Sequence, residues 1–279
     1  MIHYLMDVSW FLYRGAFALH HVYSEYSELH FLCKKIESLL KREDACLHIC
    51  LDGANPKGKR LLKNTYKGNR VLEEGNYNVY KGLSSFVHLV NNPRIKFYYN
   101  PNYESDEIIF TLSCTLDGRK KILSGDKDIL QSLKNDTVIE SFNGLVTTED
   151  SYKDEYADKF FEIDPPRLPI FRAIAGDPSD NLNPPVARFP RKLAARIAKE
   201  LDYDGNVPTI EELKTISMSY KDNEKKWVNK LIEAYTPYSI NFDIMKLNVI
   251  TDPLDCEYTY PQEDLGDFLK QKILKLNLL

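Results

Sequence analysis

Short apolar runs that end in acidic residues recur along the first half of the chain, and they constrain its fold more than any other feature. A short apolar run closed by glycine or a polar residue is typical of a buried strand. Three such runs with the acids that follow them are residues 2–6 with Asp7, residues 46–51 with Asp52, and residues 122–124 with Asp126 and Asp128. The recurrence predicts several strands, each ending in a carboxylate.

Segments with helical periodicity separate these runs. Helices are expected at residues 8–19, 31–40, 83–90 and 104–116, and two further strands at 95–99 and 137–141. Strands that alternate with helices predict an α/β fold with a parallel, Rossmann-like sheet flanked by helices. Ligands bind such sheets beyond the carboxyl ends of the strands, where the acids lie.

Strand signals nearly stop after about residue 165. Helices are expected at residues 168–175, 191–201, 210–216 and 225–235, followed by an extended segment at 242–250. We therefore expect two domains, with the sheet in residues 1–165 and a helical lobe in residues 166–279.

The composition is that of an ordinary globular protein, with 43% hydrophobic and 28% charged residues in a chain of 279. No apolar run approaches the roughly 20 residues of a membrane helix, and the first residues lack the features of a signal peptide. The five cysteines show no CxxC spacing, which indicates reduced thiols. We expect a cytoplasmic protein without a membrane partner.

Nine carboxylates are candidates for one shared cleft. They are Asp7, Asp52, Glu104, Asp106, Glu107, Asp126, Asp128, Asp177 and Asp180. Any one of them alone is as well explained as a turn residue or a helix cap. Together they would repel one another strongly unless divalent cations neutralise them. Ligand sets made only of oxygen favour Mg²⁺ or Mn²⁺, and two such ions suit phosphodiester hydrolysis.

Residues 56–81 form a basic segment in which lysines and arginines alternate with tyrosines. A net charge of −4 does not exclude a nucleic-acid partner, because a local basic patch can coexist with an acidic metal site. A solvated lysine-rich loop would explain the same composition.

The motifs together resemble the 5′ nuclease and flap endonuclease family, which includes stand-alone phage enzymes and the 5′ nuclease domain of bacterial DNA polymerase I. The matching stretches are LMDVS at residues 5–9, YKGNR at 66–70, ESDE at 104–107, SGDKD at 124–128 and GDPSDN at 176–181. The resemblance implies a PIN-like nuclease domain, a basic arch at residues 56–81 and a C-terminal lobe of helix-hairpin-helix type.

The resemblance also implies an activity: Mg²⁺-dependent 5′-3′ exonuclease or structure-specific flap endonuclease, leaving a 5′-phosphate and a 3′-hydroxyl in replication or repair. The expected partner is DNA with 5′ ends, flaps or junctions, or an RNA-DNA hybrid. The expected protein is a monomer from a prokaryotic or phage-infected cell. Two Mg²⁺ or Mn²⁺ ions are expected, the first on Asp7, Asp52, Glu104, Asp106 and Asp126, the second on Asp128, Asp177 and Asp180. Glu107 stands where the family usually has aspartate.

Two groups of residues would contact DNA. Lys67 and Arg70 match the basic pair of the arch and would act on the scissile phosphate, because their cations offset charge that grows in the transition state. The remaining candidates for DNA binding are Arg14, Lys63, Tyr66, Arg188, Arg191, Lys192, Arg196 and Lys199. A solvated basic helix face is the alternative explanation for the last three.

The segment at 183–190 departs from the family pattern because it has no glycine. It therefore predicts a hairpin loop without positive backbone φ angles, and potassium binding is not carried over. Two alternatives stay open: a PIN-type ribonuclease, and a catalytically weakened paralogue that binds DNA structures.

Overall fold

The computed structural model describes residues 1–19, 25–53, 79–258 and 260–278. Within these ranges, no helix is both long enough and apolar enough to cross a lipid bilayer. The predicted basic arch lies mostly in residues 54–78, so Lys63, Tyr66, Lys67 and Arg70 fall outside the described residues.

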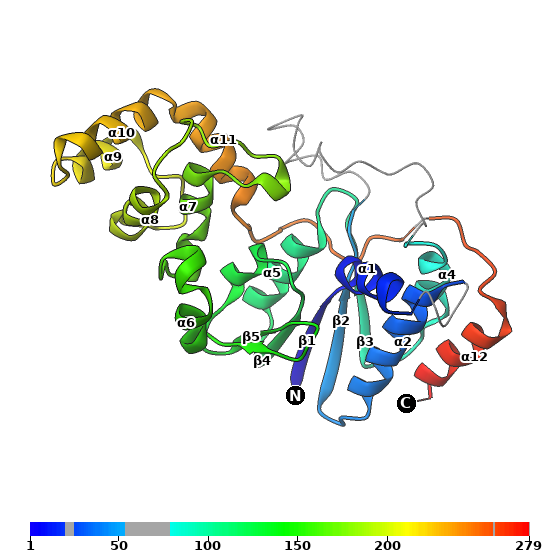
Figure 1. The fold of residues 1–279 in the computed structure, drawn as a ribbon. Helices are drawn as coiled ribbons and strands as arrows, with labels where there is room; N and C mark the ends of the chain where they lie inside the picture. Colours follow the sequence, from blue (N-terminus) through cyan, green and yellow to red (C-terminus); the bar gives the residue numbers. More distant parts are fainter. Residues whose placement is uncertain (20–24, 54–78, 259, 279) are drawn as a thin grey trace.

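A six-stranded sheet forms the centre of the first half of the chain, in the order β3-β2-β1-β4-β5-β6 (Figure 1). The strands are β1 (Ile2–Asp7), β2 (Ala45–Cys50), β3 (Ile95–Tyr98), β4 (Arg119–Leu123), β5 (Thr137–Glu140) and β6 (Val146–Thr147). The first five strands run parallel to one another, and β6 is antiparallel to β5. The predicted α/β fold with a parallel sheet is confirmed. The two-residue β6 is too short for any periodicity to reveal.

Helices cover both faces of this sheet. They are α1 (Val8–Leu19), α2 (Ser27–Leu40), α4 (Leu83–Leu89) and α5 (Ser105–Thr115), with a 3₁₀ turn η1 (Asp128–Ser132) after β4. Successive residues of β1 alternate between two cores: Tyr4 and Met6 pack on the α2 side, and Leu5 packs on the α5 side. Burial of both faces is what a parallel sheet requires.

A helical lobe follows the sheet (Figure 1). Helix α6 (Glu149–Phe160) follows β6 and lies beside the sheet (Figure 1). The elements of the lobe are η2 (Pro165–Arg167), α7 (Leu168–Ala175), η3 (Pro178–Asp180), α8 (Arg191–Glu200), α9 (Ile210–Ser217), α10 (Asp222–Glu233) and α11 (Tyr235–Met245). The core of the lobe is continuous with the core beneath α5. The predicted extended segment at 242–250 is wrong in its first part, because Phe242, Ile244 and Met245 are buried on the last turn of α11.

The end of the chain returns to the N-terminal half. Tyr99 N–H donates to the carbonyl of Leu254 at 2.6 Å, and Cys256 N–H donates to the carbonyl of Tyr99 at 3.1 Å. Helix α12 (Gly266–Leu276) then packs beside α2 and α4 (Figure 1). Residues 252–258 and 260–278 therefore pack with the sheet domain, and the predicted domain boundary near residue 165 stays a prediction.

Candidate active site

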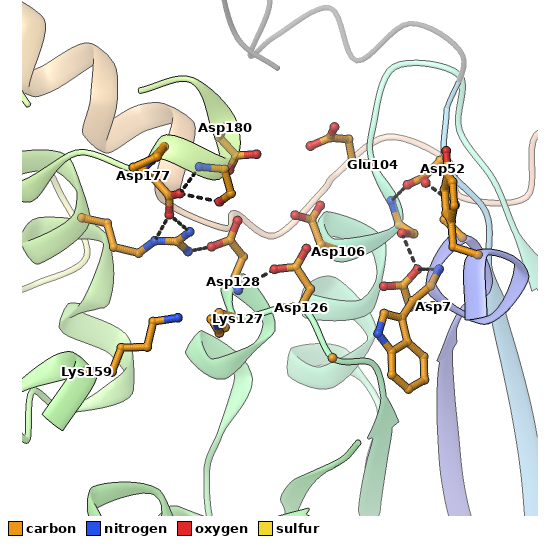
Figure 2. A pocket seen from close by; sticks show the side chains of 18 of the residues that line it. Asp7, Asp52, Glu104, Asp106, Asp126, Lys127, Asp128, Lys159, Asp177 and Asp180 are labelled. Atoms are coloured by element: carbon orange, nitrogen blue, oxygen red, sulfur yellow. Dashed lines mark hydrogen bonds and ion pairs between the residues drawn. The ribbon is translucent and has the colours of Figure 1, made fainter. Parts of the chain in front are cut away.

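A cavity of about 690 Å³ opens at the carboxyl ends of the parallel strands. Eight of the nine predicted carboxylates line it: Asp7, Asp52, Glu104, Asp106, Asp126, Asp128, Asp177 and Asp180. Figure 2 shows them as a row that runs from Asp180 and Asp177, through Asp128, Asp126 and Asp106, to Asp52 and Asp7. The structure thus brings together acids that are up to 173 residues apart in the chain.

Asp7 is the last residue of β1, and the strand order reverses between β1 and β4. This is where open α/β sheets bind their ligands. Its carboxylate accepts hydrogen bonds from Trp10 N–H at 3.1 Å, Ser105 Oγ at 3.2 Å and Ser124 Oγ at 2.9 Å. Burial, and then the charge of Asp52, raise the pKa of Asp7 to about 7. The acidic centre therefore favours a proton or a cation.

Asp52, just after β2, is oriented by two serines. Ser105 N–H donates to its carboxylate at 2.7 Å, and the Ser9 hydroxyl donates to the other oxygen. Tyr80 O–H donates to the Ser9 oxygen at 3.1 Å. The stretches LMDVS, ESDE and SGDKD each contain a serine within two residues of an acid. These serines are the sequence feature that could have predicted the hydrogen-bond donors.

The first turn of α5 supplies two more carboxylates. Glu104 occupies the N-cap position, and Asp106 lies in the first turn, both largely buried. Glu107 Oε2 accepts a hydrogen bond from Glu104 N–H at 3.1 Å and so caps the helix instead of lining the cavity. Ligand atoms of all three nevertheless lie within 4.8 Å of one another. A metal role for Glu107 stays a prediction.

The acidic turn after β4 lies in the middle of the row, between Asp177 and Asp180 on one side and Asp7 and Asp52 on the other (Figure 2). Ser124 Oγ accepts from Asp126 N–H at 3.1 Å, and Asp126 accepts from Asp128 N–H at 2.9 Å. A Cβ atom on Gly125 would lie only 2.5 Å from Nε1 of Trp10, so the close approach of that ring requires glycine here.

Arg172 on α7 joins Asp128 and Asp177 and is the main residue that sequence reasoning missed. Its guanidinium is paired with both carboxylates, and Nε donates to Asp177 at 2.9 Å (Figure 2). Burial raises the pKa of Asp177, but Arg172 and Ser179 outweigh it and leave that pKa below its usual value. Arg172 is the single charged residue in the apolar run LPIFRAIA of α7. This pattern could have predicted an ion pair, because a buried arginine needs an acidic partner.

Comparisons with known proteins show the family of this chain. A model of the family "5'-3' exonuclease, N-terminal resolvase-like domain" matches residues 3–161, more than half of the chain. The chain belongs to this family. It is 27% identical to a 5'-3' exonuclease of Aquifex aeolicus over 289 aligned positions, covering 99% of this chain and 92% of that protein.

Other relatives are longer or more distant. DNA polymerase I of Streptococcus pneumoniae is 25% identical over 245 positions, covering 84% of this chain, which spans only about a quarter (26%) of that polymerase. The solved bacteriophage T5 D15 flap endonuclease, in a complex with DNA and metal ions, aligns with a TM-score of 0.64 at 17% identity and full coverage of both chains. That structural likeness shows the shared fold.

In this member of the exonuclease family, basic residues border the part of the cavity that contains Asp128 and Asp177. Lys127, Lys159 and Arg191 line it beside Arg172 (Figure 2 labels the two lysines). Burial, followed by the neighbouring Lys127, lowers the pKa of Lys159 to about 8. Arg191 lies over the Phe171 ring, with Cζ 5.0 Å from the ring centroid. The acidic row therefore faces cations on one side.

The predicted DNA-binding residues have unequal surroundings. Arg14 is exposed and lies near the rings of Trp10 and Phe142, while Lys192 is exposed on α8. Arg196 is paired with Glu200 at 2.8 Å and Glu224 at 3.2 Å, and Lys199 Nζ lies 3.7 Å from Glu162. The helix face is thus only partly available for phosphates.

The loop that follows Asp180 contradicts one prediction. Asn181 and Arg188 both adopt left-handed backbone, with φ of 57° and 59°. The hairpin therefore reaches positive φ without glycine. Asparagine tolerates this region, and mutual hydrogen bonds between the backbones of Asp177 and Leu182 fix the turn around Asn181.

Proposed function

We propose that the protein is a Mg²⁺-dependent 5′ nuclease that hydrolyses phosphodiester bonds in DNA with 5′ ends, flaps or junctions. It would leave a 5′-phosphate and a 3′-hydroxyl and serve replication or repair. The convergence of eight carboxylates in one cavity carries this proposal. Membership of the 5'-3' exonuclease family supports it.

The donor set fits divalent cations. The row offers only carboxylate oxygens, which hard cations such as Mg²⁺ and Mn²⁺ prefer. The raised pKa of Asp7 points the same way, because a cation would relieve the repulsion between Asp7 and Asp52. One ion would be held by Asp7, Asp52, Glu104, Asp106 and Asp126, the other by Asp128, Asp177 and Asp180.

Ions bound there would supply an activated water and stabilise charge on the transferring phosphate. The contribution of the chain itself is orientation. Donors from Ser105 and Ser124 fix both oxygens of Asp7, so its carboxylate is held before the substrate arrives. Ser9 and the backbone of Ser105 do the same for Asp52. Preorganised ligands of this kind lower the reorganisation cost of the reaction.

Cations of the chain would hold the substrate. Lys127, Lys159 and Arg191 border the cavity where a phosphate backbone would enter. On the family pattern Lys67 and Arg70 would contact the scissile phosphate, while Lys192 and Arg188 would contact duplex farther away. The DNA in the complex of the structurally similar T5 flap endonuclease supports a DNA substrate for this fold.

A substrate panel tests the proposal. Purified protein with Mg²⁺ is offered 5′-flap, nicked, blunt and single-stranded DNA, with RNA counterparts, and the product ends are mapped. We expect cleavage of DNA that carries 5′ ends or flaps, with 5′-phosphate products, and loss of cleavage in Asp177→Asn. Cleavage of RNA alone would favour the ribonuclease alternative. Tight DNA binding without cleavage would favour the weakened paralogue.

A further inference from the structure

A second cluster of metal-ligating side chains lies on β1 and β2, toward the amino ends of these strands and away from the acidic cavity. His3 on β1 pairs in register with Cys46 on β2, and His48 follows two residues later on the same face. His3 Nδ1 lies 2.8 Å from His48 Nε2, and one ligand atom of each of the three residues lies within 4.8 Å of the others.

The cluster is separate from the acidic cavity. Asp7 follows His3 by four residues on the same strand, which places the two about 13 Å apart at the usual rise per residue. In Figure 1, β1 begins near the N label and ends beside α1. His3 and Cys46 lie at the amino ends of β1 and β2, whereas the carboxylate row lies beyond the carboxyl ends of the strands.

The donor atoms are suited to a borderline-soft cation. Burial lowers the pKa of His3, and it lowers the pKa of His48 to about 4, so burial favours the neutral form of both rings, which is the form that binds metals. The facing ring nitrogens of His3 and His48 are 2.8 Å apart, so at least one of them carries no proton and directs its lone pair at the other. Imidazole nitrogen together with cysteine thiolate is the set that Zn²⁺ takes in proteins.

The remaining ring nitrogens have partners. His48 Nδ1 lies 3.1 Å from Tyr98 Oη, and the two rings are stacked with centroids 5.5 Å apart. The ring of His3 is hydrogen-bonded to the backbone of Asp117. Such contacts fix the tautomer and the ring orientation of metal-binding histidines. They leave His3 Nδ1 and His48 Nε2 directed toward each other as the two ligand atoms.

Small movements would complete the coordination. Tetrahedral Zn²⁺ with Zn–N bonds of about 2.0–2.1 Å separates two nitrogens by roughly 3.4 Å, so the histidines need to open by about half an ångström. His3 and Cys46 are partly exposed, which leaves the fourth position to water or an external ligand. Nearby positive charge is moderated, because Lys120 is paired with Asp136 at 2.6 Å and Lys96 is exposed.

We propose that His3, Cys46 and His48 form a binding site for a divalent ion of the Zn²⁺ class. The ion would replace one proton, that of the Cys46 thiol, and would be bound by two neutral imidazoles. The site lies outside the nuclease machinery and does not rest on the proposed function.

Cobalt titration tests this site, with Mg²⁺ in excess to occupy the carboxylates. A thiolate bound to Co²⁺ gives a charge-transfer absorption that oxygen ligands cannot give. We expect the band to saturate at one equivalent in the wild type and in Cys114→Ala, whose exposed thiol lies outside the cluster. It should disappear in Cys46→Ala. Added Zn²⁺ should abolish the band by displacement.

His3→Gln is the second variant, because His3 is partly exposed and its replacement spares the buried His48. We expect Co²⁺ affinity to fall at least tenfold while circular dichroism and Mg²⁺-dependent DNA cleavage stay unchanged. Absence of the band in the wild type would overturn the proposal. So would an unchanged band in Cys46→Ala, or an unchanged affinity in His3→Gln.

Discussion

Single side chains divide the acidic row into two groups that are neutralised differently. Asp7 and Asp52 receive hydrogen bonds from serine and backbone donors but have no cationic partner that the structure describes. Asp128 and Asp177 share the guanidinium of Arg172. We infer that the first group depends more strongly on a bound cation than the second.

Arg172→Met tests the role of the buried guanidinium. The side chains of Arg172, Asp128 and Asp177 are only 9–14% exposed, so removing the cation leaves two carboxylates unpaired. Breaking a buried pair costs about 3–5 kcal/mol. We expect urea unfolding in chelator to show a loss of this size, partly restored by Mg²⁺. Arg196→Met, which breaks more exposed pairs, should lose far less, and equal losses would refute the assignment.

Asp7 makes the stability of the metal-free protein depend on pH. Its pKa is about 7 in the folded state, against about 3.9 in an unfolded chain. Between these values the folded state binds more protons, so its contribution is full below pH 4 and is lost as the pH rises through 7. We expect the melting temperature in chelator to fall more between pH 5 and 8 in the wild type than in Asp7→Asn. Parallel profiles would contradict this.

At the level of elements, strand ends could be predicted from the sequence and several helices could not. Apolar runs ending in acids identified β1, β2 and β4, because strand burial and the acidic edge both leave local signals. Helix α6 lacks an apolar periodicity, since of its twelve mostly charged or polar residues only Tyr152 and Phe160 are buried. The partners of Arg172 depend on tertiary packing that joins α7 to the turn after β4.

Helix α8 allows a matched comparison of two basic residues. Lys192 is exposed, whereas Arg196 pairs with Glu200 and Glu224 and lies over the Tyr220 ring. If α8 contacts phosphates, Lys192→Ala should weaken DNA binding uniformly across sequences and reduce the salt slope by about one. Arg196→Ala should change the slope less. Binding measured at several salt concentrations checks this, and an unchanged slope in Lys192→Ala would remove α8 from the interface.

For the molecule as a whole, the C-terminal helix completes the core on one face of the sheet. Ile273 on α12 is fully buried in the same core as Met6 and Leu32, while Leu274 is 47% exposed. Ile273→Ala should lower the free energy of unfolding by about 2–5 kcal/mol. Leu274→Ala should change it little. Chemical denaturation measures both, and equal effects would show that α12 does not dock as described.

We propose that the carboxylate cavity binds divalent ions and that DNA cleavage requires these ions. Single-turnover cleavage of a 5′-flap DNA by the wild type and Asp126→Asn, with Mg²⁺ or with chelator, tests it most directly. Loss of a residue that merely supports a metal ligand costs about 10–100-fold. We therefore expect a larger fall in rate for Asp126→Asn, with DNA affinity largely retained, and no cleavage in chelator. Cleavage by the wild type in chelator, or an unchanged rate in Asp126→Asn, would contradict the account.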